Sequence, residues 1–242
     1  MDDRRPDLKI NGSSSASGGL YRDVLINGDA RIDGDTECEF FKVNGVASVT
    51  GNLKVKTGKI NGTASIRGDL NATEFKVFGT SDLRGNLSGG KFQIEGSAQV
   101  TNISVEEIKL HGSLSVRGDC NAERFSSMGG FNIDGLLNAG TIEVDLFAPC
   151  RAKEVGGEKI TVRRSTASKL SRLIKSIFLH SDDGLIAECI EGDDINLEYT
   201  KAKTVRGNNI NLGPGCEIEL VEYKDNFTPA SESRIKEQRK IG

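Results

Sequence analysis

The chain has 242 residues, enough for one large domain or two small ones with a sizeable core. Its 32 basic and 35 acidic side chains nearly cancel, so no overall field points to nucleic acid as a partner. The sequence contains no apolar run near the ~18 residues of a membrane span. The opening MDDRRPDLK lacks the apolar core of a secretory signal, so we expect a cytoplasmic protein.

Cysteine and histidine usage limits the chemistry further. The cysteines are odd in number, scattered and free of any CxxC motif, which favours free thiols over a disulfide framework or a zinc site. They are Cys38, Cys120, Cys150, Cys189 and Cys216. The two histidines, His111 and His180, lie far apart and exclude mechanisms that need several imidazoles. We therefore expect no metal and no cofactor.

Glycines repeat at a nearly constant spacing in the first part of the chain. One series, 16 or 17 residues apart, is Gly28, Gly45, Gly62, Gly79, Gly96, Gly112 and Gly129. A second lies six residues behind it, at Gly34, Gly51, Gly68, Gly85, Gly118 and Gly135, with Asn102 in place of one glycine. Such self-similarity indicates a repeat architecture.

Each copy alternates apolar and polar residues over short stretches. In the copy that starts at Ile60, the apolar pairs are Ala64 with Ile66, Leu70 with Ala72, and Phe75 with Val77. Three strands of two or three residues, each followed by a corner, predict an all-β fold: a β-solenoid of triangular coils of about 17 residues. We expect the glycines at the corners to adopt positive φ. Asn11, Asn27, Asn44 and Asn61 share one position and are expected to stack as a side-chain ladder.

Five segments follow from the pattern. A polar amino-terminal segment spans 1–7, the repeat domain spans 8–160, and a basic helical insert spans 161–183. Further coils are expected over 184–223, and 224–242 is expected to be a disordered polar tail.

The insert has the spacing of a short amphipathic helix and contains bases without acids over 161–180. Two interpretations stay open. In one, the apolar stripe packs on the solenoid and the bases face the acidic stretch that follows. In the other, the helix binds an anionic membrane surface or a partner. The residues concerned are Arg163, Arg164, Lys169, Leu170, Arg172, Leu173, Ile174, Lys175, Ile177 and Phe178.

The repeats INGTASIRGDLNATEFK and LHGSLSVRGDCNAERF, with an apolar-x-Gly step, a Gly-Asp step and then x-Ala, resemble those of the bactofilins, polymer-forming bacterial cytoskeletal proteins. The resemblance covers roughly residues 10–160, and residues 190–223 look like the carboxy-terminal part of longer Gram-positive members. It implies a right-handed β-helix that forms nonpolar filaments end to end without nucleotide, often at the inner membrane face, in cell shape, wall organisation or motility. The chain departs from many members in lacking an apolar amino-terminal stretch and in carrying the insert.

The open ends of a solenoid explain why such a fold would self-associate. Backbone groups at each end lack partners, so two copies can pair there unless the ends are capped. The residues expected at these joints are Ile10, Leu20 and Val24 at one end and Ile218, Leu220 and Val221 at the other. We therefore expect a homopolymer, with an anionic membrane surface and cell-envelope or motility proteins as further partners.

Two alternatives stay open. The first is a monomeric solenoid that acts as a docking or adaptor protein. The second is a hexapeptide-type acyltransferase, which is disfavoured because the apolar-Gly step does not recur every six residues on all three faces. Constant coil length also leaves no cleft for catalysis. The sequence thus predicts a protein that is not an enzyme and binds neither nucleic acid nor nucleotide.

Overall fold

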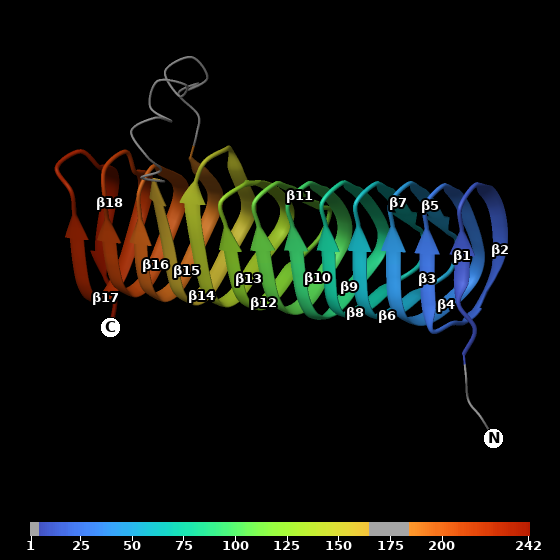
Figure 1. The fold of residues 1–242 in the computed structure, drawn as a ribbon. Helices are drawn as coiled ribbons and strands as arrows, with labels where there is room; N and C mark the ends of the chain where they lie inside the picture. Colours follow the sequence, from blue (N-terminus) through green and yellow to red (C-terminus); the bar gives the residue numbers. More distant parts are fainter. Residues whose placement is uncertain (1–4, 165–183) are drawn as a thin grey trace, which may run out of the picture. The chain divides into compact units, whose positions relative to one another are not determined.

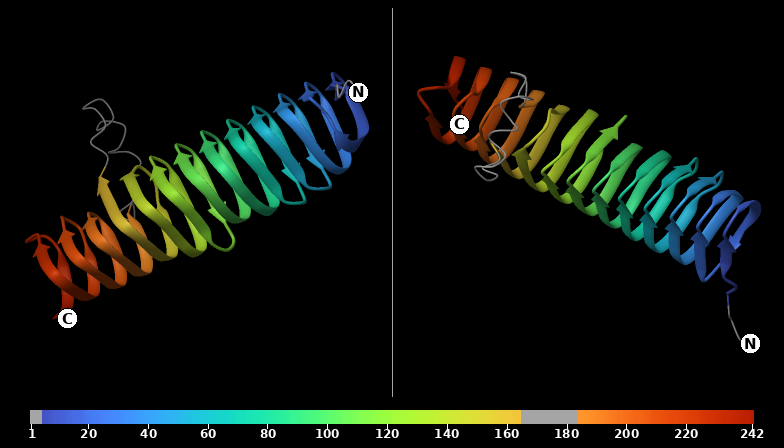
Figure 2. Two further views of the ribbon diagram at one scale, coloured as in Figure 1. Left: turned by 90° about the horizontal axis from the view of Figure 1, so that it is seen from below. Right: turned by 45° about the horizontal axis from the view of Figure 1, so that its top comes forward.

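The structure is a computed structural model that describes residues 5–164 and 184–242. Within these residues the chain forms strands and turns but no helix, and the predicted β-solenoid is confirmed, with about 13 turns of about 17 residues. The chain divides into two compact units, unit 1 (Met1–Ala122) and unit 2 (Glu123–Gly242). Each unit is a stack of coils (Figures 1 and 2). No helix in the described part is long and apolar enough to cross a membrane.

The strands of unit 1 are β1 (Leu8–Ile10), β2 (Ser13–Leu20), β3 (Asp23–Ile26), β4 (Asp29–Val43), β5 (Val46–Val49), β6 (Leu53–Ile60), β7 (Thr63–Ile66), β8 (Leu70–Val77), β9 (Thr80–Ile94), β10 (Ser97–Leu110), β11 (Ser113–Val116) and the start of β12 (Cys120–Ser127). Unit 2 contains the rest of β12, then β13 (Gly130–Leu146), β14 (Cys150–Arg164), β15 (Leu185–Leu197), β16 (Thr200–Leu212), β17 (Glu217–Pro229) and β18 (Arg234–Lys240).

Parallel pairing places the repeats of unit 1 in register on three faces. Face A stacks 8–10, 23–26, 40–43, 57–60, 74–77, 91–94 and 107–110. Face B stacks 13–17, 29–33, 46–49, 63–66, 80–83, 97–100 and 113–116. Face C stacks 19–20, 36–38, 53–55, 70–72, 87–89 and 102–105. Several strands run around the corners. β4, β9 and β10 each contribute to all three faces, so the strands are longer than the predicted two or three residues.

In unit 2, face A stacks 141–146, 159–164, 194–197, 209–212 and 226–229. Face B stacks 131–133, 150–152, 185–187, 200–202, 217–218 and 234–235, and face C stacks 136–138, 154–157, 189–192, 204–207, 220–223 and 237–240.

The core is a column of alternate residues that point inward. Ile26, Val43, Ile60 and Val77 are fully buried one above another on face A. The column accommodates large rings by leaving gaps beside them: a Cβ on Gly58 would lie 2.2 Å from the ring of the next coil's phenylalanine, Phe75. Pairing a glycine with a phenylalanine keeps the narrow interior filled without overpacking.

The corner glycines serve a different purpose from the one predicted. Among the described residues of the two glycine series, only Gly34 has positive φ, at 109°. In the first series a Cβ on Gly62 would lie 2.0 Å from the carbonyl oxygen of Gly45, and a Cβ on Gly79 would lie 2.0 Å from that of Gly62. Glycine recurs because the corner of one coil lies directly against the backbone of the coil before it.

We expect the Gly62→Ala variant to lose about 1–3 kcal/mol of unfolding free energy, because neighbouring coils must separate to admit the methyl group. Gly12 occupies the same position in the first described coil, and a Cβ there has no atom within 4 Å. The control variant Gly12→Ala should change stability by less than about 0.5 kcal/mol. Denaturant unfolding of both variants measures the difference, and equal effects would contradict the close-approach explanation.

Two polar ladders run along the corners of unit 1. The predicted asparagine ladder is confirmed: each Nδ2 donates to the Oδ1 of the coil before it, at 2.8 Å for Asn27 to Asn11 and 2.7 Å for both Asn44 to Asn27 and Asn61 to Asn44. A second ladder explains the Gly-Asp or Gly-Asn step. There the backbone N–H of residues 52, 69 and 86 donates at 2.8 Å to the side-chain oxygen of the Asp or Asn one coil earlier.

The predicted disordered tail is wrong. Residues 224–229 continue β17, and β18 pairs with it in register, Ile218 with Ile235 and Val221 with Gln238. The polar composition is typical of a disordered tail, but the segment is an ordered outer strand. Most of its side chains face solvent, while backbone hydrogen bonds hold it in place. The predicted helix falls largely on residues 165–183, outside the described part of the chain.

Candidate self-association edges

The first described coil of unit 1 has one open side. β1 pairs with β3, and β2 pairs with β4, so each uses one of its two backbone edges (Figure 1). An unpaired parallel edge offers a row of N–H and C=O groups to any strand of matching geometry. The edge of β1 and β2 is therefore the first candidate joint.

β2 differs from β4, the strand stacked on it, in carrying no charge and, apart from Leu20, only small side chains, SSSASGGL. Its inward positions Ser14 and Ala16 are in register with Ala30 and Ile32 of the next coil. Ser14 is exposed and Ala16 is half-buried, whereas Ala30 and Ile32 are buried. Small side chains therefore cover the end of the core on this face, and most of the atoms exposed along the edge belong to the backbone.

Tyr21 adjoins the same edge. Its hydroxyl donates to the carbonyl oxygen of Ser17 at 2.8 Å, and its N–H donates to the carbonyl oxygen of Glu37 at 2.8 Å. The ring lies over Gly19, 3.8 Å from where a Cβ of that residue would stand. Tyr21 therefore closes the rim of the core at this end and braces β2.

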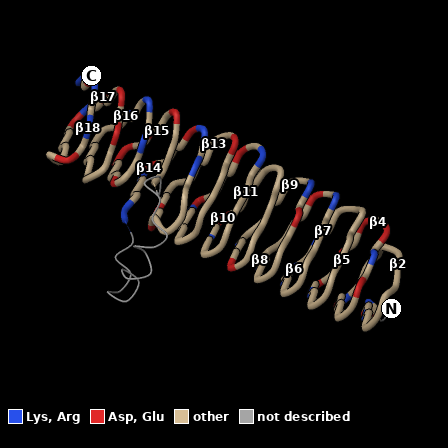
Figure 3. Tube along the Cα trace, turned by 90° about the horizontal axis from the view of Figure 1, so that it is seen from above, with Lys and Arg blue, Asp and Glu red and all other residues tan. Residues whose placement is uncertain are grey.

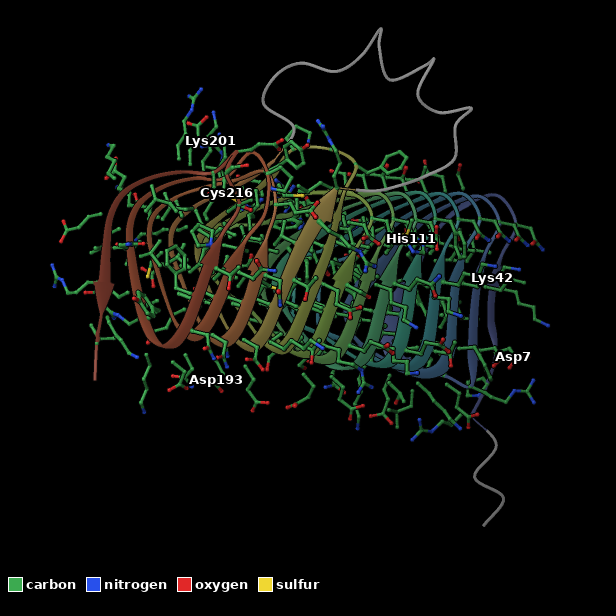
Figure 4. All side chains as sticks on the ribbon, turned by 90° about the vertical axis from the view of Figure 1, so that its left-hand side faces the viewer. Asp7, Lys42, His111, Asp193, Lys201 and Cys216 are labelled. Atoms are coloured by element: carbon green, nitrogen blue, oxygen red, sulfur yellow. The ribbon has the colours of Figure 1, made fainter. Side chains whose placement is uncertain are left out.

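Ion pairs fix the chain just before β1. Asp7, labelled in Figure 4, accepts from Nε of Arg22 at 3.0 Å and from its Nη2 at 2.8 Å. The Arg22 guanidinium holds the pKa of Asp7 below its usual value. Arg5 and then Lys54 lower the pKa of Glu37 in the same way, with the Arg5 contact at 2.9 Å. These contacts secure the first coil to the second.

A pH dependence follows from the lowered pKa of Asp7. A carboxyl group with a lower pKa in the folded state adds stability above its unfolded pKa of about 3.9, and this stability is lost as pH falls through the folded value. We expect the first coil to loosen below about pH 4. Amide exchange of Arg22, whose N–H donates to the Pro6 carbonyl at 3.0 Å, should then accelerate. In the Asp7→Asn control this acceleration should be absent.

The residues predicted for the first joint do not share one position. Ile10 lies on β1 in the outermost coil and is 6% exposed, and Leu20 lies on β2 and is 59% exposed. The placement of Val24 at the edge is wrong, because Val24 belongs to the second coil, pairs with Leu8 and is 1% exposed.

The residues predicted for the other end do not lie on an edge. Ile218, Leu220 and Val221 belong to β17, and β18 covers that strand in register. The outermost strand of unit 2 is instead charged along most of its length, with the sequence RIKEQRK. Charged side chains on an edge strand discourage pairing with other chains.

A buried carboxylate attaches β18 to the coils before it. The Glu222 side chain is 9% exposed and accepts from Arg206 at 2.7 Å and from Arg239 at 3.4 Å. These residues come from three successive strands, β16, β17 and β18. We call Glu222 with its partners Arg206 and Arg239 the clamp. These contacts explain how so polar a strand stays ordered.

We expect Glu222→Gln to raise amide exchange across β18 by about tenfold, equivalent to about 1.4 kcal/mol of local opening free energy. The substitution keeps the shape of the side chain but removes the charge between two guanidinium groups. Glu219→Gln on the same strand is the matched control, because Glu219 is 55% exposed and its pair with Lys236 is open to solvent. Equal exchange in both variants would contradict the clamp.

The basic segment predicted to meet a membrane is described only at its start. Arg163 pairs with Asp145, which raises the pKa of the guanidinium, and the Arg164 guanidinium lies 4.0 Å from the centre of the Tyr199 ring. Both side chains are thus engaged within unit 2. The other predicted residues lie outside the described part of the chain: Lys169, Leu170, Arg172, Leu173, Ile174, Lys175, Ile177 and Phe178.

The thiols are free, as predicted. Burial raises the pKa of both Cys38 and Cys120 to about 12, and burial also raises the pKa of Cys189 and Cys216. At neutral pH these four side chains are neutral thiols, poorly suited to nucleophilic chemistry. His111 lies at a corner with Nδ1 3.0 Å from Oε1 of Glu95, where other coils carry the asparagine ladder.

Two uncharacterized proteins of Bacillus subtilis (strain 168) share sequence with this chain. YhbF is 39% identical over 89 residues, which cover 37% of this chain and 34% of YhbF. YhbE is 37% identical over 92 residues, which cover 37% of this chain and 36% of YhbE. The chain is a β-solenoid protein related in part to both, and the matches span about a third of either relative. No protein-family model and no solved structure matches it.

Proposed function

We propose that this protein is a bactofilin-like scaffold whose copies join through the open edge of β1 and β2. The observation that carries the proposal is the unpaired outer edge of β2, which carries no charged side chain and whose inward side chains, Ser14 and Ala16, are small. A second copy supplies the missing strand partners through backbone hydrogen bonds across the joint, and two identical edges related by a twofold axis pair as antiparallel strands. Neither nucleotide nor metal takes part in such a joint.

Joining two identical edges gives a contact with twofold symmetry. Each β2 then meets the β2 of its partner, and the assembly has no polarity at that joint. Growth beyond a dimer needs a second joint, at the β18 end of unit 2, where the charged strand must pair or shift. A filament with these two alternating joints would support cell shape, wall organisation or motility from the cytoplasm, at the inner face of the membrane.

Sedimentation velocity over a range of protein concentrations tests the proposal. The purified chain, free of nucleotide and metal, should form dimers and larger species as its concentration rises. A single species of 26.0 kDa at every concentration would exclude self-association of the purified protein.

The charged strand β18 favours a second candidate, a monomeric or dimeric docking protein. With five ionisable residues in seven, β18 resembles the edge strands that natural proteins use to block further pairing. In that case sedimentation stops at the dimer, joined through β2, and the outer faces of the coils serve as the binding surface.

A further inference from the structure

Face B of unit 2 carries charge in rows that alternate in sign from coil to coil. The rows are Asn132 and Asp134 on β13, Arg151 and Lys153 on β14, Ile186 and Glu188 on β15, Lys201 and Lys203 on β16, Glu217 and Glu219 on β17, and Arg234 and Lys236 on β18. They line a groove of about 740 Å³, and Figure 3 colours the basic and acidic positions along these coils. Figure 4 labels Lys201, an exposed member of the β16 row.

The alternation is confined to unit 2. Face B of unit 1 carries Arg31 and Asp33 on β4 and Asp82 on β9, but the rows between them on β5 and β7, and the row on β11, have only valine, serine and threonine at their outward positions. A solenoid face therefore folds without a charge that changes sign at every coil, and this alternation on β13–β18 calls for a reason beyond coil stacking.

Contacts within the chain account for only part of the pattern. Lys203 pairs with Glu188 at 3.1 Å and Lys236 with Glu219 at 2.8 Å, and all four side chains remain more than half exposed. The β14 row, by contrast, has no ion pair among the described residues, although both of its side chains are exposed. Exposed ion pairs contribute little to folding, about 0–1 kcal/mol each, so these charges remain available to a partner.

We propose that this charge-row face binds the same face of a second copy, with the two solenoid axes antiparallel and the twofold axis between the β15 and β16 rows. This rotation sets the β13 row against the β18 row, β14 against β17, and β15 against β16. Each basic row then faces a row with at least one acid: β17 carries two acids, and β13 and β15 each carry one acid and one neutral residue. With parallel axes, every row would instead face the identical row of the second copy, and the like charges would repel each other.

The contact is small. Six rows spaced about 4.8 Å apart, each about 10 Å wide, cover roughly 300 Å² per copy, against about 800 Å² in a standard interface. One such contact is weak, but a filament repeats it along its length and gains avidity. The lateral contact therefore rests on the proposed polymer for its strength, although not for its geometry.

Zero-length carbodiimide cross-linking of mixed ¹⁵N-labelled and unlabelled full-length chains tests the pairing. The antiparallel face predicts mixed-isotope cross-links between Lys153 and Glu219 and between Asp134 and Lys236. Within one chain these pairs lie three and five coils apart, about 14 Å or more, beyond the reach of a zero-length bond. Absence of both cross-links in samples that contain filaments would overturn the inference and leave the proposed function intact.

Charge reversal provides a second test of the antiparallel pairing. In the variant Arg151→Glu/Lys153→Glu, the yield of the Asp134 to Lys236 cross-link should fall by about tenfold or more, although neither of these residues is changed. Mixing this chain with the variant Glu217→Lys/Glu219→Lys should restore it, because reversed rows then face each other. The matched control Ser113→Glu/Ser115→Glu adds two acids to the same face of unit 1 and should leave the yield unchanged.

Electron microscopy of the same samples separates this inference from the proposed function. If filaments are absent, cross-linking at millimolar concentration still tests the face, and the predicted pairs should appear. Cross-links between identical rows, or a yield unaffected by the β14 reversal, would show that the antiparallel pairing is incorrect. Circular dichroism of each variant establishes that a lost cross-link does not reflect unfolding.

Discussion

The Ala16→Lys variant is expected to stay folded but to form no polymer at concentrations where the wild-type chain associates. Ala16 points inward on β2 and is in register with Ile32, yet it is only half-buried because no strand among the described residues pairs with the outer edge of β2. A lysine there reaches solvent in the free chain. In a joint it would be buried against the backbone of a second copy, and a buried, unpaired charge costs several kcal/mol.

The control for this variant is Ser15→Lys. Ser15 lies next to Ala16 on the same strand, in register with the outward-facing Arg31, so its lysine would remain in solvent in a joint as well. Sedimentation velocity compares the two variants. Polymers of Ala16→Lys that match those of Ser15→Lys would show that the β2 edge is not the joint.

The Phe75→Ala variant should lose about 3–5 kcal/mol of unfolding free energy. Phe75 is fully buried, and its ring fills the space left by Gly58 on the coil before it. Its other neighbour in the column is Phe92, whose ring centre lies 6.3 Å away. Removing the ring therefore leaves two successive coils without a large side chain at this point of a narrow core.

Phe78→Ala is the comparison for Phe75→Ala. Phe78 is 44% exposed at a corner, with the ammonium group of Lys59 4.7 Å from its ring centre. Its loss should cost less than about 1 kcal/mol. Denaturant unfolding gives both values, and a small effect of Phe75→Ala would mean that the column is not the main source of stability.

The fold could be predicted because its determinants are local and repeated. The alternation around Ala64 and Ile66 sets which side chains point inward, and the two glycine series set the coil length. The asparagine ladder followed from Asn11, Asn27, Asn44 and Asn61 sharing one position. A pattern repeated over many coils averages out the ambiguity of any single short strand.

The ends could not be predicted, because they depend on what covers the last coil. β18 has the composition of a solvated segment, and its order depends on pairing with β17 and on the clamp around Glu222. The sequence does not show that Leu8 pairs with Val24, so it does not reveal that Val24 belongs to the second coil. The reason for the glycine repeat is visible only in the structure, because a close approach between coils and a positive φ produce the same sequence pattern.

Negative-stain electron microscopy of the purified full-length chain, without nucleotide or metal and over a range of salt concentrations, tests the central claim most directly. The account predicts filaments a few nanometres wide in the wild-type protein, and their absence in Ala16→Lys under the same conditions. Uniform short particles of wild-type protein at every concentration and salt would contradict it.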